Sequence, residues 1–146
     1  MDFTAPISTI MTRKLVTVIP TDRLTLVKEI FESSRFHHIP VVKNKTLVGL
    51  ISSVDLVQFL KGAGCVNHDG LIETSRLDNF TVEDVMTKKL ATLESTDRIN
   101  VALEVFGENL FHAIPIVDHG ELVGILTTLD VIKALQKEDT IRIMSN

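Results

Sequence analysis

The sequence predicts a mixed α/β (α+β) protein that contains two copies of a β-α-β-β-α unit. The first observation behind this prediction is an internal repeat, in which residues 10–56 align without a gap with residues 85–131, at a constant offset of 75 residues. The second is that short β-branched runs and amphipathic segments follow one another in the same order in both copies. A period of this length is too long for a solenoid or a propeller, so it indicates a duplicated small domain.

In the first copy, the β-branched run Leu15 to Val18 predicts a strand. From Asp22 to Ser34, apolar residues recur at intervals of three and four with charged residues on the other face, which predicts an amphipathic helix. Two short apolar runs with a polar connection, residues 38–42 and 47–52, predict a pair of strands. Helical spacing returns from Ser53 to Leu60.

The second copy predicts the same elements in the same order. We expect a strand at 90–93, a helix at 97–109, strands at 113–117 and 122–127, and a helix at 128–136. The predicted organisation is therefore a first domain at 7–60, a linker at 61–79 rich in Gly and polar residues, a second domain at 80–137 and a C-terminal tail at 138–146. The sequence leaves the structure of the tail open.

The composition is that of a globular protein. Of 146 residues, 45% are hydrophobic, which is ample for a core of Ile, Val and Leu. No apolar run reaches the ~20 residues of a membrane span, and the single cysteine, Cys65, fits a reducing compartment. We therefore expect a cytoplasmic protein without a membrane partner. The net charge of -4 does not favour binding to nucleic acid.

Both copies end their last predicted strand with one pattern, which runs from Gly49 to Asp55 and from Gly124 to Asp130. Its hydroxyl residue, Ser52 or Thr127, lies where a strand turns into a helix, close to free N–H groups that favour a phosphate. The Asp that closes each pattern can accept two hydrogen bonds from the 2′ and 3′ hydroxyls of a ribose. Together these groups indicate a nucleotide site without a catalytic residue.

The same spacing also occurs in the capping box of a helix, with Ser52 or Thr127 at the N-cap and the Asp at N3. The two roles are compatible, because a capped helix still presents other N–H groups. The sequence alone leaves both open.

A second cluster precedes the middle strand of each copy, as Phe36-His37-His38-Ile39-Pro40 and Phe111-His112-Ala113-Ile114-Pro115. A histidine at this position can donate a hydrogen bond to a phosphate oxygen, and a surface or capping histidine is the alternative. The five histidines include no pair at helical metal-ligand spacing and no cysteine partners, so we expect no metal site.

These motifs resemble those of the tandem cystathionine β-synthase domain pair, or CBS-domain pair. Three features carry the resemblance from about residue 7 to residue 136: Ile10-Met11-Thr12 with Val85-Met86-Thr87, the two histidine clusters, and the two Gly-to-Asp endings. The resemblance implies two repeats packed about a pseudo-twofold axis with two clefts between them, and a homodimer. It also implies a regulatory adenosine ligand, AMP, ADP, ATP or S-adenosylmethionine, and no obligatory cofactor.

The resemblance also implies roles for particular residues. Asp55 and Asp130 would hold ribose hydroxyls, Ser52 and Thr127 would meet phosphate, and His37, His38 and His112 would line the phosphate end. The base would be bordered by Thr17, Thr92, Ile39, Pro40, Ile114 and Pro115. Family members that bind phosphate strongly often have Arg directly after the histidine, where this chain has His38 and Ala113. Because Arg35 has Leu110 as its counterpart, we expect unequal sites that favour AMP.

We therefore expect a regulatory protein, not an enzyme, that senses an adenosine nucleotide and transmits its occupancy to a partner protein or a second chain through a change in the angle between the copies. The rival hypothesis is a nucleotide-free scaffold that dimerises and binds a protein. Hydrolysis of the bound nucleotide is a third hypothesis, for which the sequence offers neither a metal set nor a general base.

Overall fold

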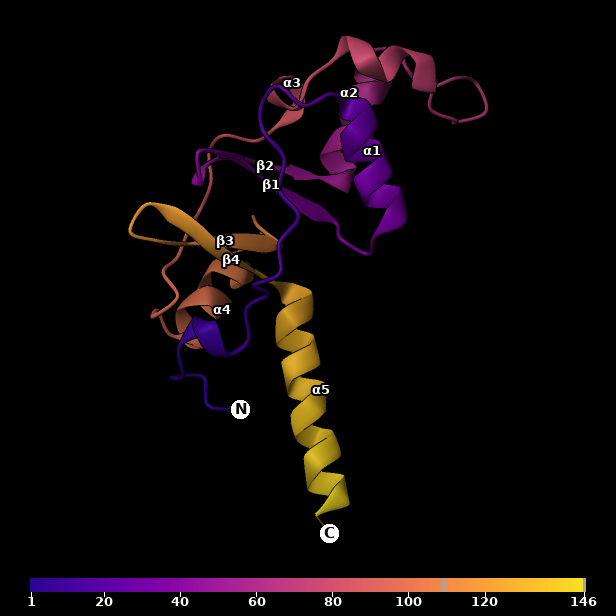
Figure 1. The fold of residues 1–146 in the computed structure, drawn as a ribbon. Helices are drawn as coiled ribbons and strands as arrows, with labels where there is room; N and C mark the ends of the chain where they lie inside the picture. The colour runs from indigo at the N-terminus through magenta and orange to yellow at the C-terminus, as the bar shows by residue number, and fades with distance from the viewer. Residues whose placement is uncertain (109, 146) are drawn as a thin grey trace. The chain divides into compact units, whose positions relative to one another are not determined.

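The chain folds into two compact units, which are shown in Figure 1. The computed structural model describes residues 1–108 and 110–145, with residues 139, 140 and 142 described by their backbone only. Unit 2 is the continuous segment Val16–Leu90, whereas unit 1 joins Met1–Leu15 to Ala91–Asn146. The start of the chain therefore folds with the second copy of the repeat, and the start of the second copy folds with the first.

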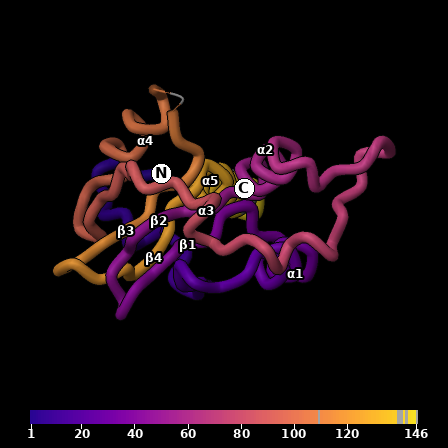
Figure 2. Tube along the Cα trace, turned by 90° about the horizontal axis from the view of Figure 1, so that it is seen from above, coloured from indigo at the N-terminus to yellow at the C-terminus, as the bar shows by residue number. Residues whose placement is uncertain are grey.

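Unit 2 contains an antiparallel hairpin of β1 (His38–Lys43) and β2 (Thr46–Ser52). Its helices are α1 (Leu24–Ser33), α2 (Ser53–Gly62), the 3-10 helix η2 (Thr74–Asn79) and α3 (Val82–Val85). The hairpin turns at Asn44 and Lys45, whose φ angles of 51° and 67° match a type I′ turn. In Figure 2 this turn lies at the end of the unit that is away from α1 and α2.

The core of unit 2 explains why these segments fold as they do. The apolar side of α1 contributes Leu24 and Val27, and every second residue of β1, Ile39 and Val41, joins them. Val82 of α3 is fully buried in the same core. Burying each side chain of this size stabilises the fold by about 1.5–3 kcal/mol, so α3 is a structural part of unit 2.

Unit 1 has the same plan. Its elements are η1 (Ile7–Thr9), α4 (Ile99–Gly107), β3 (Ala113–Asp118), β4 (Glu121–Thr127) and α5 (Thr128–Met144). β3 and β4 pair antiparallel, and the turn between them uses positive φ angles at His119 and Gly120. Ile7 and Met11, from the start of the chain, pack in the core with residues such as Ile114.

The two predicted strands at 15–18 and 90–93 are wrong as strands, because each is reduced to a single parallel bridge, Val18 with Val41 and Leu93 with Ile116. Val18 donates its N–H to Pro40 O at 3.1 Å and accepts from Val42 N at 2.9 Å. To extend the ladder toward Leu15, Pro40 would have to donate an N–H to Val16, and proline has no N–H. To extend it in the other direction, Pro20 would have to donate to Val42, so the ladder cannot grow at either end.

The other predicted strands and helices are confirmed, with shifted ends. The helix predicted at 128–136 continues to Met144 and takes in most of the tail that the sequence left open. The helix predicted at 97–109 is observed as Ile99–Gly107, and Asn109 lies outside the described residues. None of the described helices is both long enough and apolar enough to cross a membrane.

Candidate functional site

The corner where β2 meets α2 holds the first pair of predicted site residues. Ser52 is the N-cap of α2, and its Oγ accepts a hydrogen bond from Asp55 N at 3.0 Å. Asp55 Oδ2 accepts in return from Ser52 N at 3.3 Å. The capping box anticipated from the sequence is therefore confirmed at this corner, whereas the ligand role of the two residues stays a prediction.

The histidine cluster lies beside the same corner. Ser53 N donates to the carbonyl oxygen of His37 at 2.9 Å, and His38 pairs with Ser52 across the hairpin. The His37 side chain is exposed, while His38 is half-buried and engaged in a further interaction. The fold thus brings His37, His38, Ser52 and Asp55 together within unit 2.

The residues predicted to border a base lie further along β1. Thr17 is exposed and directly precedes Val18, whose N–H is bonded to Pro40 O. Pro40 is buried, and the side chain of Ile39 lies in the core of unit 2 with no exposed surface. Contact between Ile39 and a base would therefore involve its backbone, not its side chain.

The corner of unit 1 repeats this arrangement with Thr127 and Asp130. Asp130 Oδ2 accepts from Thr127 N at 2.8 Å and from Thr127 Oγ1 at 3.0 Å, and Asp130 N donates to Thr127 Oγ1 at 3.2 Å. The exposed His112 lies alongside, because its carbonyl oxygen accepts from Thr128 N at 3.2 Å.

Thr92, Ile114 and Pro115 of unit 1 occupy the places of Thr17, Ile39 and Pro40. Leu93, which follows the exposed Thr92, donates its N–H to Pro115 O at 3.3 Å. The side chain of Ile114 is fully buried in the core. Each unit therefore carries one complete set of the predicted residues.

The two carboxylates differ in one contact. In unit 1, Thr12 Oγ1 donates to Asp130 Oδ1 at 3.0 Å, so both oxygens of Asp130 are engaged. In unit 2, Asp55 Oδ1 accepts no hydrogen bond from the part of the chain that the structure describes. The corners are thus unequal in their capacity to accept a hydrogen bond from a ligand.

Thr12 is the site residue that sequence reasoning missed. A signal was available, because Thr12 and Thr87 are identical at the repeat offset. Thr87 exchanges two backbone hydrogen bonds with Leu50, at 2.9 and 3.1 Å, just as Thr12 does with Ile125 at 2.9 and 3.0 Å. These bonds place both threonines beside the last strand of their unit, but only Thr12 bonds the Asp.

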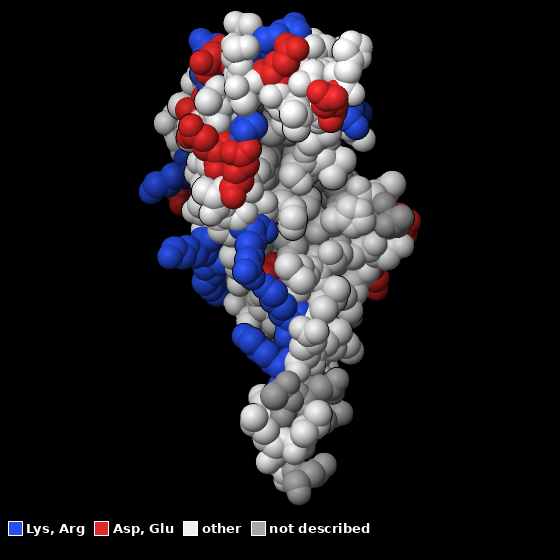
Figure 3. All heavy atoms as spheres, turned by 90° about the vertical axis from the view of Figure 1, so that its right-hand side faces the viewer, with Lys and Arg blue, Asp and Glu red and all other residues white. Residues whose placement is uncertain are grey.

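Metal-ligating side chains do not gather into a candidate site in the part of the chain that the structure describes. No group of three or more His, Cys, Asp and Glu that could hold a metal ion occurs among the described residues. On the face drawn in Figure 3, residues other than Lys, Arg, Asp and Glu cover most of the surface, and both acidic and basic side chains occur on it.

Comparison with known proteins identifies relatives over most of the chain. The family model of the CBS domain matches residues 7–62 and again residues 82–137. Among curated proteins, the uncharacterized protein MJ1225 of Methanocaldococcus jannaschii is 29% identical over 124 residues, which cover 84% of this chain and 44% of MJ1225. The chain spans less than half the length of the first curated relatives that it matches.

Solved structures share the fold. The crystal structure of MJ1225 superposes with a TM-score of 0.79 at 28% identity, and the match covers 92% of this chain and 49% of MJ1225. The structure of CBSX2 in complex with AMP gives a TM-score of 0.76 at 24% identity, over 92% of this chain and 98% of that one. The CBS domain pair of MJ0100, in complex with 5-methylthioadenosine and S-adenosyl-L-methionine, gives 0.76 at 19% identity, with coverage of 92% and 98%.

Proposed function

Because this chain belongs to the CBS-domain family, we propose that it is a regulatory protein, without catalytic activity, that binds an adenosine nucleotide and passes its occupancy to a partner protein or a second chain. The observation that carries the proposal is the carboxylate of Asp55, which caps α2 with Oδ2 and keeps Oδ1 available. An ionised carboxylate oxygen is a strong acceptor for a ribose hydroxyl.

The neighbours of Asp55 supply the remaining groups for a nucleotide. The N-terminus of the ten-residue helix α2 begins at this corner, so its N–H groups and dipole favour a phosphate. The exposed His37 side chain lies next to it and can donate a further hydrogen bond. With His38 in place of an Arg after this histidine, the site favours the single phosphate of AMP over longer phosphate chains.

The nucleotide binds more weakly to the corner of unit 1. There Thr12 already donates to Asp130 Oδ1, so a ribose hydroxyl has to displace it. Unit 1 also has Leu110 at the position of Arg35. AMP in CBSX2 and S-adenosyl-L-methionine in MJ0100 support the choice of adenosine ligands as the first to test.

The test is thermal unfolding of protein purified free of nucleotide, with AMP, ADP, ATP and S-adenosylmethionine in turn. A ligand at about 100 times its dissociation constant should add about 2.7 kcal/mol of stability. Replacing Asp55→Asn retains an oxygen that can cap α2 but removes the charge, so we expect AMP affinity at the stronger site to fall roughly tenfold. Asp130→Asn should affect only the weaker site.

Asp84→Asn is the matched control. Asp84 is also an N3 residue in unit 2, and its Oδ2 accepts from Thr81 N at 2.9 Å in the capping box of α3. This variant should lose a similar amount of stability and bind AMP as the unaltered protein does. The proposal fails if no adenosine ligand raises the unfolding temperature, or if Asp55→Asn binds AMP with unchanged affinity.

A nucleotide-free interaction scaffold is the second candidate, and exposed apolar side chains on two helices favour it. Val54 on α2 and Ile132 on α5 are 62% and 51% exposed, and Leu129 is 47% exposed. Leu129 and Ile132 are neighbours one turn apart on α5, and contiguous exposed apolar surface is typical of protein contacts. Native mass spectrometry separates the candidates, since a co-purified nucleotide mass supports sensing and a bare dimer supports the scaffold.

A further inference from the structure

A cavity lies in unit 2, away from the corner of β2 and α2 described above. It has a volume of about 530 Å³ and lies at the turn of the β1–β2 hairpin, where it is lined by Lys43 and Asn44. The register runs from His38 opposite Ser52 at one end to Lys43 opposite Thr46 at the other. Five residues of strand separate the ends, which corresponds to about 16 Å. The hairpin-turn pocket is therefore distinct from the proposed nucleotide site.

The pocket combines an apolar lining with charged residues. Ile19, Val48 and Met86 line it, and Ile19 remains 48% exposed although isoleucine is normally among the most buried residues. Val48 lies at the irregularity in the hairpin register, which occurs between Val41 and Val42 on the facing strand. A volume of this size is within the range of small-molecule sites, which are largely apolar with a few placed polar groups.

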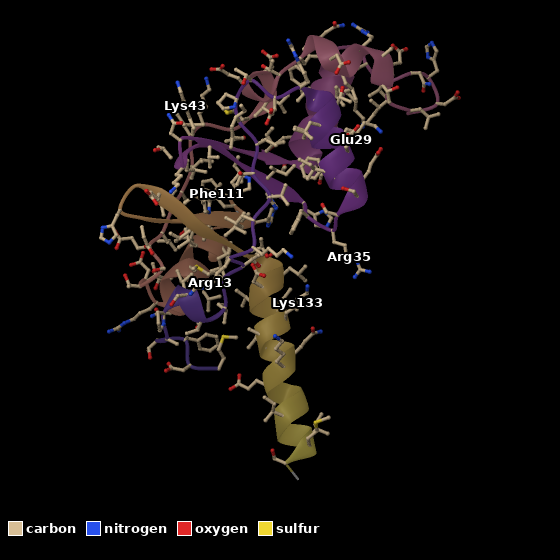
Figure 4. All side chains as sticks on the ribbon, in the orientation of Figure 1. Arg13, Glu29, Arg35, Lys43, Phe111 and Lys133 are labelled. Atoms are coloured by element: carbon tan, nitrogen blue, oxygen red, sulfur yellow. The ribbon has the colours of Figure 1, made fainter. Side chains whose placement is uncertain are left out.

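The charges of the pocket favour an anion. Lys88 Nζ lies 3.7 Å from Glu83 Oε1, so these two line the pocket as a loose ion pair. Lys43 lies at the outer end of the hairpin (Figure 4), and its ammonium group forms no hydrogen bond or ion pair with the described residues. One unpaired positive charge beside an apolar surface suits a ligand with one negative charge.

The internal repeat shows what occupies the equivalent place in unit 1. At the repeat offset of 75 residues, Asp118 corresponds to Lys43, Ser95 corresponds to Pro20, and Arg13 corresponds to Lys88. The Asp118 carboxylate accepts from Ser95 Oγ at 2.5 Å and from Ser95 N at 2.9 Å. These two bonds hold the pKa of Asp118 below its ordinary value, with smaller contributions from His119 and Arg13. Unit 1 therefore supplies a carboxylate of its own at this position.

Unit 2 cannot make this contact. Lys43 removes the carboxylate, and Pro20 has neither a hydroxyl nor an N–H to donate. The pocket keeps the basic residue that corresponds to Arg13, namely Lys88, and adds a second in Lys43. The substitutions thus replace the acid and its hydroxyl partner of unit 1 by a lysine and a proline, both of which line the pocket.

We propose that the hairpin-turn pocket binds a small monocarboxylate with an apolar body. The carboxylate pairs with Lys43, which stands where unit 1 has the carboxylate of Asp118. The apolar body covers Ile19, Val48 and Met86.

The experiment is an NMR titration of the full ¹⁵N-labelled chain with 4-methylpentanoate, with 4-methylpentanamide as its uncharged isostere and acetate as the acid without an apolar body. The amide signals of Ile19, Asn44 and Met86 should shift with 4-methylpentanoate. Loss of a charge-assisted hydrogen bond should make the amide bind roughly tenfold more weakly, and acetate should bind more weakly as well. Equal binding of acid and amide, or no shift in these signals, would overturn the proposal.

Two variants and a matched control locate the site. Lys43→Met should weaken 4-methylpentanoate binding roughly tenfold, whereas Lys89→Met, an exposed lysine that does not line the pocket, should leave it unchanged. Pro20→Ser combined with Lys43→Asp transfers the Ser95–Asp118 contact of unit 1 and should abolish binding with the fold retained. The same affinity in Lys43→Met as in the unaltered protein would contradict the assignment.

Discussion

At the scale of single residues, the two glycines of the repeated pattern are required for packing. A Cβ atom at Gly49 would lie 2.6 Å from Met86 Sδ and 3.1 Å from Met86 Cβ, and a Cβ at Gly124 would lie 3.0 Å from the carbonyl oxygen of Thr12. Each glycine thus lets the segment containing Met86 or Met11 approach the last strand of its unit.

Replacement of Gly49→Ala should therefore destabilise the protein by about 1–3 kcal/mol, since overpacking forces neighbouring atoms to move. Gly62→Ala is the control, because a Cβ at this helical position meets no atom within 4 Å and alanine favours helix. Urea unfolding measures both. Equal stability of the two variants would show that the close approach to Met86 is relieved without cost.

The sequence predicted the hydroxyl and acid of each corner because both occur at fixed spacing in one short segment. It did not predict that Thr12 bonds Asp130, since 118 residues separate them and only the tertiary fold brings them together. The unequal affinity expected from Arg35 and Leu110 stays a prediction, and the structure adds a second difference, the hydroxyl of Thr12 on Asp130.

At the scale of elements, a substitution in the capping box of α2 measures how much the box stabilises the helix, apart from any role in binding. Ser52→Ala should destabilise the protein by about 1 kcal/mol, because α2 loses the oxygen that accepts from Asp55 N. Ser53→Ala, one residue later, should be nearly neutral because its hydroxyl makes no such contact among the described residues. Chemical denaturation measures both variants. A neutral Ser52→Ala would mean that the cap contributes little to α2.

The paired strands and longer helices were predictable because apolar periodicity determines which face is buried. The outcome at 15–18 and 90–93 was not predictable in the same way. The β-branched residues there indicate extended backbone, but they do not show how many hydrogen bonds a neighbouring strand can make. Pro20 and Pro40 limit that ladder to one bridge, and Pro115 does the same on one side in unit 1. The four-residue helix α3 was missed because it is too short to show a period.

At the scale of the whole molecule, the alignment of the two copies shows that each contains one β-α-β-β-α unit. It does not show whether the start of each copy packs with its own copy or with the other one. The structure answers this through Ile7 and Met11, which are buried with the second copy, and Val82, which is buried with the first. The predicted domain limits at 7–60 and 80–137 describe the sequence copies and remain a prediction for independently folding pieces.

Because the start of each copy packs with the other copy, the structure predicts which fragments of the chain can fold alone. A fragment of residues 16–90 retains the whole core of unit 2, including Val82 and Met86, and should unfold cooperatively. A fragment of residues 7–81 has the same length but lacks these residues and exposes Ile7 instead. Loss of a buried valine and the contacts that follow it should make 7–81 less stable by at least about 2 kcal/mol, or unfolded, since domains of this size are marginal. Urea unfolding followed by circular dichroism compares the two, and equal stability would mean that residues 82–90 contribute no net stability to unit 2.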